Sequence, residues 1–94
     1  MGSFARDMHS HTDTELRHIF VDTLGLKPEQ AARFTPDTGL FGHLPELDSM
    51  AVAGLLTEIE DRLGIIIDDD EVDGELLETY GSLLTFVEAK RAAA

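Results

Sequence analysis

The sequence predicts an all-α protein: a small four-helix bundle with three longer helices, one short third helix, and a long loop between helices one and two. Three observations predict it. Apolar residues recur at helical spacing in three separate segments. Glycines follow the first two of these segments, at the point where helices commonly end. The β-prone run at 65–67 has no second strand with which to pair. With 94 residues, the chain forms a single domain.

The first helix is expected to begin near Thr12. Thr12 and Glu15 have the spacing of a capping box, in which each side chain satisfies a free amide of the other residue. Apolar residues then follow at helical spacing, namely Leu16, Ile19, Phe20 and Leu24. Gly25 supplies the end. Residues 1–11 show no period, so we expect a flexible leader there, a domain at 12–91 and a tail at 92–94.

A long loop is predicted from residue 26 to residue 47, with room for one short turn at 29–33. Prolines and glycines that break helices recur through it: Pro28, Pro36, Gly39, Gly42 and Pro45. Loops of this length are uncommon in compact domains and are often functional. Apolar side chains are expected to attach it to the core, namely Phe34, Leu40, Phe41 and Leu44.

The second helix is predicted to open at Asp48, run to Leu63 and stop at Gly64. At about 100° per residue, one apolar stripe faces the core. Its members are Val52, Leu55, Leu56, Ile59 and Leu63. The same projection turns Met50 and Gly54 away from the core and puts Ala53 beside Ser49.

The rest of the chain is predicted to be a connector, a short helix and a last long helix. We expect residues 65–67 to be extended, with side chains in the core, and residues 68–77 to hold the short third helix. Thr79 caps the last helix. Its apolar positions follow the i, i+3, i+4, i+7 pattern: Tyr80, Leu83, Leu84 and Val87. Lys90 and Arg91 suit the negative end of its dipole.

The charge pattern excludes several functions. Lys plus Arg number 7 and Asp plus Glu 19, which gives a net charge of −12. Residues 46–78 hold twelve of these acids against one base, Arg62. Such a surface repels phosphate backbones and anionic lipids, so we expect no nucleic acid and no membrane among the partners. It attracts basic proteins over long range instead. A domain of this size also builds a deep catalytic cavity with difficulty, which argues against an enzyme.

The chain contains no cysteine, which excludes disulfides, thiolate metal sites and a thiol nucleophile of its own. No apolar run reaches the length of a membrane-spanning helix, and the N-terminus lacks the apolar core of a signal peptide. From these features we expect a cytoplasmic monomer.

Ser49 is the candidate site residue. It stands at the start of the second helix, where free amides and the helix dipole favour an anion such as a phosphodiester. A long loop before it and an apolar Met50 beside it would present Ser49 to a partner. Helix capping by Asp48 or Ser49 is the alternative role for these two residues.

Asp48-Ser49-Met50 resembles the Asp-Ser-Leu motif of acyl carrier proteins, and the resemblance extends from about Thr12 to Arg91. It implies that a phosphopantetheinyl transferase attaches 4′-phosphopantetheine to Ser49 through a phosphodiester. It also implies that the thiol of this arm carries an acyl group as a thioester for delivery to partner enzymes. A chain without cysteine agrees with this, since the cofactor supplies the thiol.

The residues after Ser49 differ from those usual in carriers of fatty acid synthesis, where acids lie on the outer side of the early second helix. An uncharged patch follows Ser49, formed by Met50, Ala53 and Gly54. The acids begin further along, at Glu58, Glu60 and Asp61. The resemblance therefore implies a specialised carrier. Its partner would be an acyl-activating ligase or acyltransferase that docks an apolar surface near Ser49 and basic residues beyond it.

Two alternatives stay open. A peptidyl or aryl carrier of a nonribosomal-type pathway is one, although residues 46–48 do not match the Gly-Gly and His or Asp that usually precede its serine. An acidic divalent-metal-binding module is the other, since residues 69–74 imitate the start of an EF-hand loop. Its twelfth position is Tyr80, which cannot supply the bidentate carboxylate, so only weak binding is expected.

Two further sites are excluded by geometry. A hydrolase built on Asp48, Ser49 and His43 fails, because neighbouring Asp and Ser on one helix start cannot place a histidine between them. His9, His11 and His18 would need two ligands from the leader, which lacks a fixed geometry, so we expect no metal site.

Overall fold

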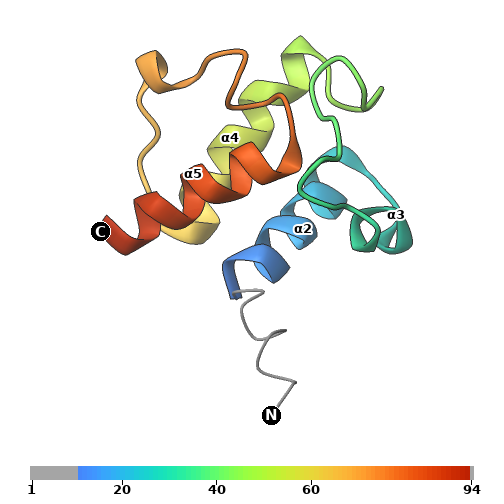
Figure 1. The fold of residues 1–94 in the computed structure, drawn as a ribbon, viewed down its shortest axis with the longest axis horizontal. Helices are drawn as coiled ribbons and strands as arrows, with labels where there is room; N and C mark the ends of the chain where they lie inside the picture. Colours follow the sequence, from blue (N-terminus) through green and yellow to red (C-terminus); the bar gives the residue numbers. More distant parts are fainter. Residues whose placement is uncertain (1–10, 94) are drawn as a thin grey trace.

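The computed structural model describes residues 11–93, and that part of the chain is all-α as predicted (Figure 1). It contains four α-helices and one 3₁₀ turn: α2 (His11–Leu24), α3 (Pro28–Ala32), α4 (Ser49–Leu63), η1 (Asp69–Glu71) and α5 (Tyr80–Ala93). Among the described residues no strand forms, and Gly39 and Thr79 make an isolated bridge. The predicted leader lies outside the described residues, except that His11 opens α2.

The start of α2 differs from the prediction. Thr12 lies inside the first turn and is buried, so the predicted capping box is wrong. Arg91 of α5 donates to the Thr12 hydroxyl at 3.0 Å and to the Glu15 carboxylate at 3.2 Å. Thr12 and Glu15 therefore join α2 to α5. Their side-chain oxygens accept hydrogen bonds from the Arg91 guanidinium instead of from backbone amides at the start of α2.

The other helix ends match the prediction. Gly25 and Gly64 have φ of 72° and 68°, the left-handed conformation in which glycine ends a helix without strain. Asp48 caps α4, and Thr79 accepts a 3.1 Å bond from the Ser82 amide at the start of α5. α3 occupies the place of the expected short turn in the long loop.

Residues 68–77 form less helix than predicted, since η1 is a single 3₁₀ turn. Its residues Asp69, Asp70 and Glu71 are all acidic, and Gly74 follows. Repulsion between neighbouring carboxylates and the low helix propensity of glycine both oppose a longer helix here.

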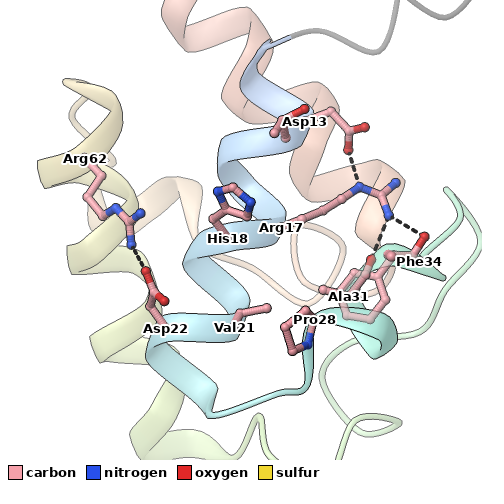
Figure 2. Close-up of a pocket in the computed structure, with 11 residues that line it drawn as sticks. Asp13, Arg17, His18, Val21, Asp22, Pro28, Ala31, Phe34 and Arg62 are labelled. Atoms are coloured by element: carbon pink, nitrogen blue, oxygen red, sulfur yellow. Dashed lines mark hydrogen bonds and ion pairs between the residues drawn. The ribbon is translucent and has the colours of Figure 1, made fainter.

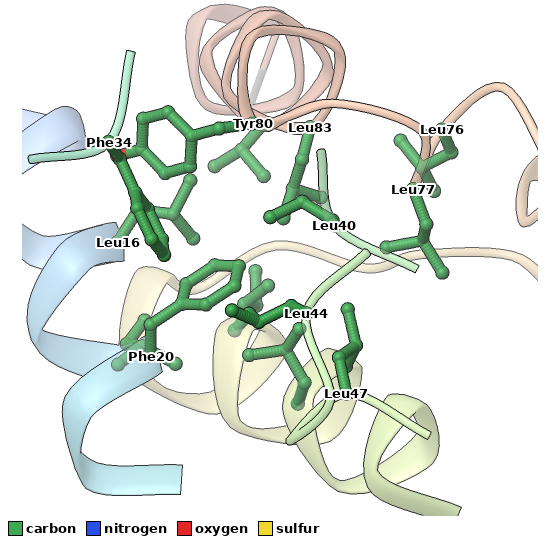
Figure 3. Packing of buried hydrophobic residues seen from close by; sticks show 14 of the residues in the cluster. Leu16, Phe20, Phe34, Leu40, Leu44, Leu47, Leu76, Leu77, Tyr80 and Leu83 are labelled. Carbon is green, nitrogen blue, oxygen red and sulfur yellow. The ribbon is translucent and has the colours of Figure 1, made fainter. Parts of the chain in front are cut away.

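The core gathers side chains from α2, α4, α5 and the loop before α4 (Figure 3). Phe20 of α2 and Phe34 of the loop meet edge to face with ring centroids 5.4 Å apart, and Tyr80 of α5 lies 5.2 Å from Phe34. The fully buried helix positions are Leu16, Ile19, Phe20, Leu55, Ile59, Tyr80, Leu83 and Val87. The loop adds Phe34, Leu40, Leu44 and Leu47.

Several predicted core positions are less buried than expected. Phe41 is 47% exposed, and Val52, Leu56 and Leu84 lie at the edge of the core. Among residues 65–67, Ile65 and Ile67 are buried and Ile66 is 74% exposed. An extended chain turns successive side chains to opposite sides, so at most alternate residues of this connector reach the core.

Backbone hydrogen bonds hold the loop before α4 against the start of α5. Leu40 and Phe41 donate to the carbonyls of Glu78 and Leu77, each at 3.0 Å. Tyr80 donates in turn to the Thr38 carbonyl at 2.8 Å. These bonds fix the loop that leads into α4. None of the helices formed by the described residues has the length and apolar character that crossing a bilayer requires.

Candidate functional site

Ser49 is exposed and is the first residue of α4. The preceding Asp48 is the cap, since its Oδ1 accepts a 2.8 Å hydrogen bond from the Ala51 amide. Within residues 11–93 the Ser49 hydroxyl makes no hydrogen bond. Of the two capping candidates in the sequence, Asp48 therefore performs that role and the Ser49 side chain remains available for chemistry.

Buried leucines before Ser49 fix its position. Leu44 and Leu47 anchor the end of the loop in the core, and the Leu47 amide donates to the Leu44 carbonyl at 2.9 Å. Residues between and after them, including Asp48 and Ser49, face solvent. The chain thus enters α4 from a fixed point, with the serine on the outside.

This position fits an anionic substituent on the serine. α4 has 15 residues, so the unpaired amides of its first turn and its dipole both favour negative charge at Ser49. The exposure of Ser49 leaves such a group hydrated, which avoids the cost of burying a charge. A phosphodiester on this hydroxyl is therefore compatible with the surroundings.

A groove of about 340 Å³ lies beside Ser49. Its lining comes from one continuous segment: Phe41, Gly42, His43, Leu44, Pro45, Leu47, Asp48 and Ser49. The half-exposed ring of Phe41 and the exposed His43 belong to it. Phe41 was predicted to lie in the core and His43 was predicted to have no role, because nothing in the sequence shows that the two residues share a groove with Ser49.

A larger groove of about 790 Å³ lies elsewhere, between α2, α3 and Arg62 of α4 (Figure 2). One ion pair joins α4 to α2 across it, and a second lies within α2. Arg62 binds Asp22 at 2.7 Å, and Arg17 binds Asp13 at 2.9 Å and also donates to the Ala31 carbonyl at 2.7 Å. Ser49 is not among its lining residues, so this groove is separate from the serine.

The predicted uncharged patch is exposed on α4. Met50 is 86% exposed, and Ala53 and Gly54 also face solvent. A Cβ atom added at Gly54 would meet nothing within 4 Å. No contact within the described residues therefore requires glycine there, although glycine in a helix interior costs about 1 kcal/mol relative to alanine.

The three predicted acidic contacts differ in their surroundings. Asp61 is exposed, and Glu58 lies 3.9 Å from Arg62. Glu60 is half-buried, and its Oε2 accepts a 2.7 Å hydrogen bond from the Ile67 amide. Glu60 thus joins the connector at 65–67 to α4. The sequence did not indicate this role, because it does not show how the chain turns after Gly64.

The residues that the sequence suggested as metal ligands do not form a cluster in the described part of the chain. Tyr80, the twelfth position of the EF-hand-like segment, is buried, and its hydroxyl binds Asp13. His11 and His18 are exposed on α2, and His9 lies outside the described residues. Between residues 11 and 93, no cluster of three His, Asp or Glu side chains has metal-binding spacing.

An exposed serine at the start of a long helix, in a small acidic helical domain, is the arrangement expected of a carrier with a covalent prosthetic group. Comparisons identify the family. A family model described as "Phosphopantetheine attachment site" matches residues 14–87. The chain is also similar to the holo acyl carrier protein of Nitrosomonas europaea, solved by solution NMR, with 40% identity and a TM-score of 0.78 over 88% of this chain and 98% of that one.

The chain belongs to the acyl carrier proteins of the phosphopantetheine-attachment family. A covalently attached phosphopantetheine is its prosthetic group, and the protein is a carrier rather than a catalyst.

Proposed function

We propose that Ser49 is the attachment point of the phosphopantetheine and that the protein delivers an acyl group from it to partner enzymes. The observation that carries the proposal is the exposed, unengaged Ser49 hydroxyl at the first position of α4, next to the capping Asp48. When the arm is attached, its thiol holds the acyl group as a thioester. The chain itself has no cysteine that would compete for the cargo.

Each neighbouring residue has a definite part in this function. Asp48 occupies the Ala51 amide and so fixes the first turn of α4 around Ser49. The remaining free amides of that turn favour the phosphodiester. Leu44 and Leu47 hold the serine outside while they stay in the core. The cytoplasmic location and the monomeric state stay predictions.

The surface around Ser49 supports a specialised carrier. Met50, Ala53 and Gly54 offer an uncharged patch beside the serine, and the exposed acid Asp61 lies about two turns further along α4. Since no contact among residues 11–93 requires Gly54, a close approach by another surface is the better explanation for it. The partner is an acyl-activating ligase or acyltransferase with an apolar contact near the arm and basic residues beyond it.

Mass spectrometry tests the attachment. Incubation with coenzyme A and a phosphopantetheinyl transferase is expected to add one phosphopantetheine to the wild-type protein and none to Ser49→Ala. Ser82→Ala is the matched control, because Ser82 is another exposed serine in the first turn of a long helix, and it is expected to load like wild type. Loading of Ser49→Ala would assign the arm to another residue.

A second assay tests the specialisation. A reconstituted fatty acid synthase, whose enzymes read acids close to the serine, is expected to extend the loaded protein poorly. Efficient extension would refute a dedicated partner while leaving the Ser49 assignment intact. The mass of the intact thioester from native cells would reveal a peptidyl or aryl cargo, if that alternative holds.

A further inference from the structure

We propose that the groove lined by residues 41–45 and 47–49 holds the first part of the phosphopantetheine arm, with Phe41 and His43 as its contacts. The inference rests on the proposed attachment at Ser49. Ser49 is itself one of the lining residues, so a group on its hydroxyl begins beside the groove of about 340 Å³. Covalent attachment gives that group a high effective concentration there, and even weak contacts suffice to hold it.

Phe41 provides the apolar wall. The neighbouring Leu40 and Leu44 are buried, while Phe41 is 47% exposed. Its backbone is fixed by a 3.0 Å hydrogen bond to the Leu77 carbonyl. An aromatic side chain has only two χ angles, so on a fixed backbone it offers apolar area with little entropy to lose on contact. The part of the arm nearest the phosphate carries two geminal methyl groups, which are the apolar surface that this ring can cover.

His43 provides the polar contact. The ionisable side chains that line the groove are His43 and Asp48, and the Asp48 carboxylate already accepts from the Ala51 amide. A histidine ring donates an N–H in either protonation state, so His43 can bind a phosphodiester oxygen or the adjacent hydroxyl of the arm. The carboxylate of Asp48 repels the same anion, which directs it toward the His43 side of the groove.

Gly39 fixes where the imidazole lies. A Cβ atom added at Gly39 would come within 2.5 Å of His43 Cγ and 2.8 Å of its Cβ. The His43 side chain therefore lies directly against the backbone at residue 39, at a distance that only glycine permits. The contact reaches the Cβ atom of His43, so Gly39→Ala would also move the backbone of the loop. His43→Ala is therefore the substitution that tests the ring, because it removes the imidazole and leaves Gly39 in place.

The groove and the uncharged patch are separate surfaces. All eight groove residues precede or begin α4, whereas Met50, Ala53 and Gly54 lie within the helix. An arm held in the groove leaves the patch free for a docking enzyme, which must then draw the arm away from Phe41 to reach its thiol. Holding the arm is thus compatible with delivery.

NMR of the apo and loaded protein tests the proposal. In the loaded wild type we expect amide shifts at residues 41–47 and nuclear Overhauser contacts between the geminal methyls of the arm and the Phe41 ring. Phe41→Ala and His43→Ala should each reduce the shifts at 41–47 that the arm causes and keep those next to Ser49. Ile66→Ala is the matched control, because Ile66 is an exposed apolar residue beyond the opposite end of α4, and it should behave as wild type.

The outcomes are distinguishable from those of the attachment assay. Mass spectrometry first establishes that each variant is fully loaded; failure to load the wild type at Ser49 contradicts the proposed function, not the groove. Loaded wild type with shifts confined to residues 48–52 and no contact to Phe41 overturns the groove. If Phe41→Ala does not fold, Phe41→Leu removes the ring while it keeps apolar bulk, and it should still lose the ring contacts and reduce the shifts.

Discussion

The Tyr80 hydroxyl donates a 2.5 Å hydrogen bond to Asp13 Oδ1, joining the start of α5 to the first turn of α2 across 67 residues of sequence. Arg17 binds the same carboxylate and lies over the Tyr80 ring, 5.0 Å from its centroid. Burial, together with the bond to Asp13, raises the pKa of Tyr80 far above its ordinary value. The phenol is therefore protonated at neutral pH and serves as the donor in this bond.

Tyr80→Phe should lower the free energy of unfolding by about 1–3 kcal/mol, because it removes one donor from a buried carboxylate while the ring packing is kept. Urea denaturation measures the change. Asp22→Asn is the control, since its pair with Arg62 is exposed and contributes at most about 1 kcal/mol. Equal stability of wild type and Tyr80→Phe would mean that the bond contributes nothing.

Leu55→Ala should cost about 2–5 kcal/mol, whereas Leu56→Ala should cost clearly less. The two neighbours belong to one predicted apolar stripe, but Leu55 is fully buried and Leu56 lies at the edge of the core. Truncating a side chain to alanine leaves a cavity only where other side chains surround it on all sides, as they do at Leu55. Denaturant unfolding of both variants provides the comparison, and the reverse order would show that α4 is rotated about its axis.

Met50→Glu should mainly raise the dissociation rate of a phosphopantetheinyl transferase, because it places a charge in the uncharged patch beside Ser49. Asp61→Lys should mainly slow association and weaken its dependence on salt. Asp61 is a better probe than Glu60, whose carboxylate also binds the Ile67 amide, so that a change there would disturb the fold. Surface plasmon resonance at several salt concentrations separates the two rates. If the two substitutions affect the same rate, the division between patch and acids is wrong.

The ion pair between Glu71 and Lys90 should contribute a pH-dependent part of the stability. Its 2.7 Å contact lowers the pKa of Glu71 below its ordinary value of 4.5, and the same contact raises the pKa of Lys90. A lowered carboxyl pKa stabilises the fold above the unfolded value, and that contribution is lost as the pH falls through the folded value. The raised Lys90 pKa contributes below about pH 10 and is lost at higher pH.

The difference in Tm between wild type and Glu71→Gln should therefore be largest near neutral pH and shrink below about pH 4.5. Thermal unfolding followed by circular dichroism between pH 3 and pH 8 measures it. Glu75→Gln serves as the control, because Glu75 is an exposed acid of the same segment with no ion pair within residues 11–93. A difference that stays constant with pH would exclude the pair as its cause.

The sequence by itself determined the helical class, the limits of α4 and the serine at its start. These features depend on local chemistry: the period of the apolar residues, the capping oxygen of Asp48, and the left-handed turn that glycine allows at Gly64. The same local rules also predicted the exposure of Met50 and Gly54, because the helical projection alone fixes which side of α4 faces away from Leu55 and Ile59.

Only the tertiary structure decided which side chains act across the fold. Thr12 and Glu15 bind Arg91 instead of capping α2, Glu60 binds the Ile67 amide, and Asp13 meets Tyr80. In each case the partner lies beyond the helix that carries the side chain, on another helix or in the connector after α4. The groove beside Ser49 is also such a result: Phe41 is turned outward because the backbone bonds between the loop and α5 place Leu40 inward. Spacing along the chain carries no information about partners brought together by folding, and for that reason these contacts required the structure.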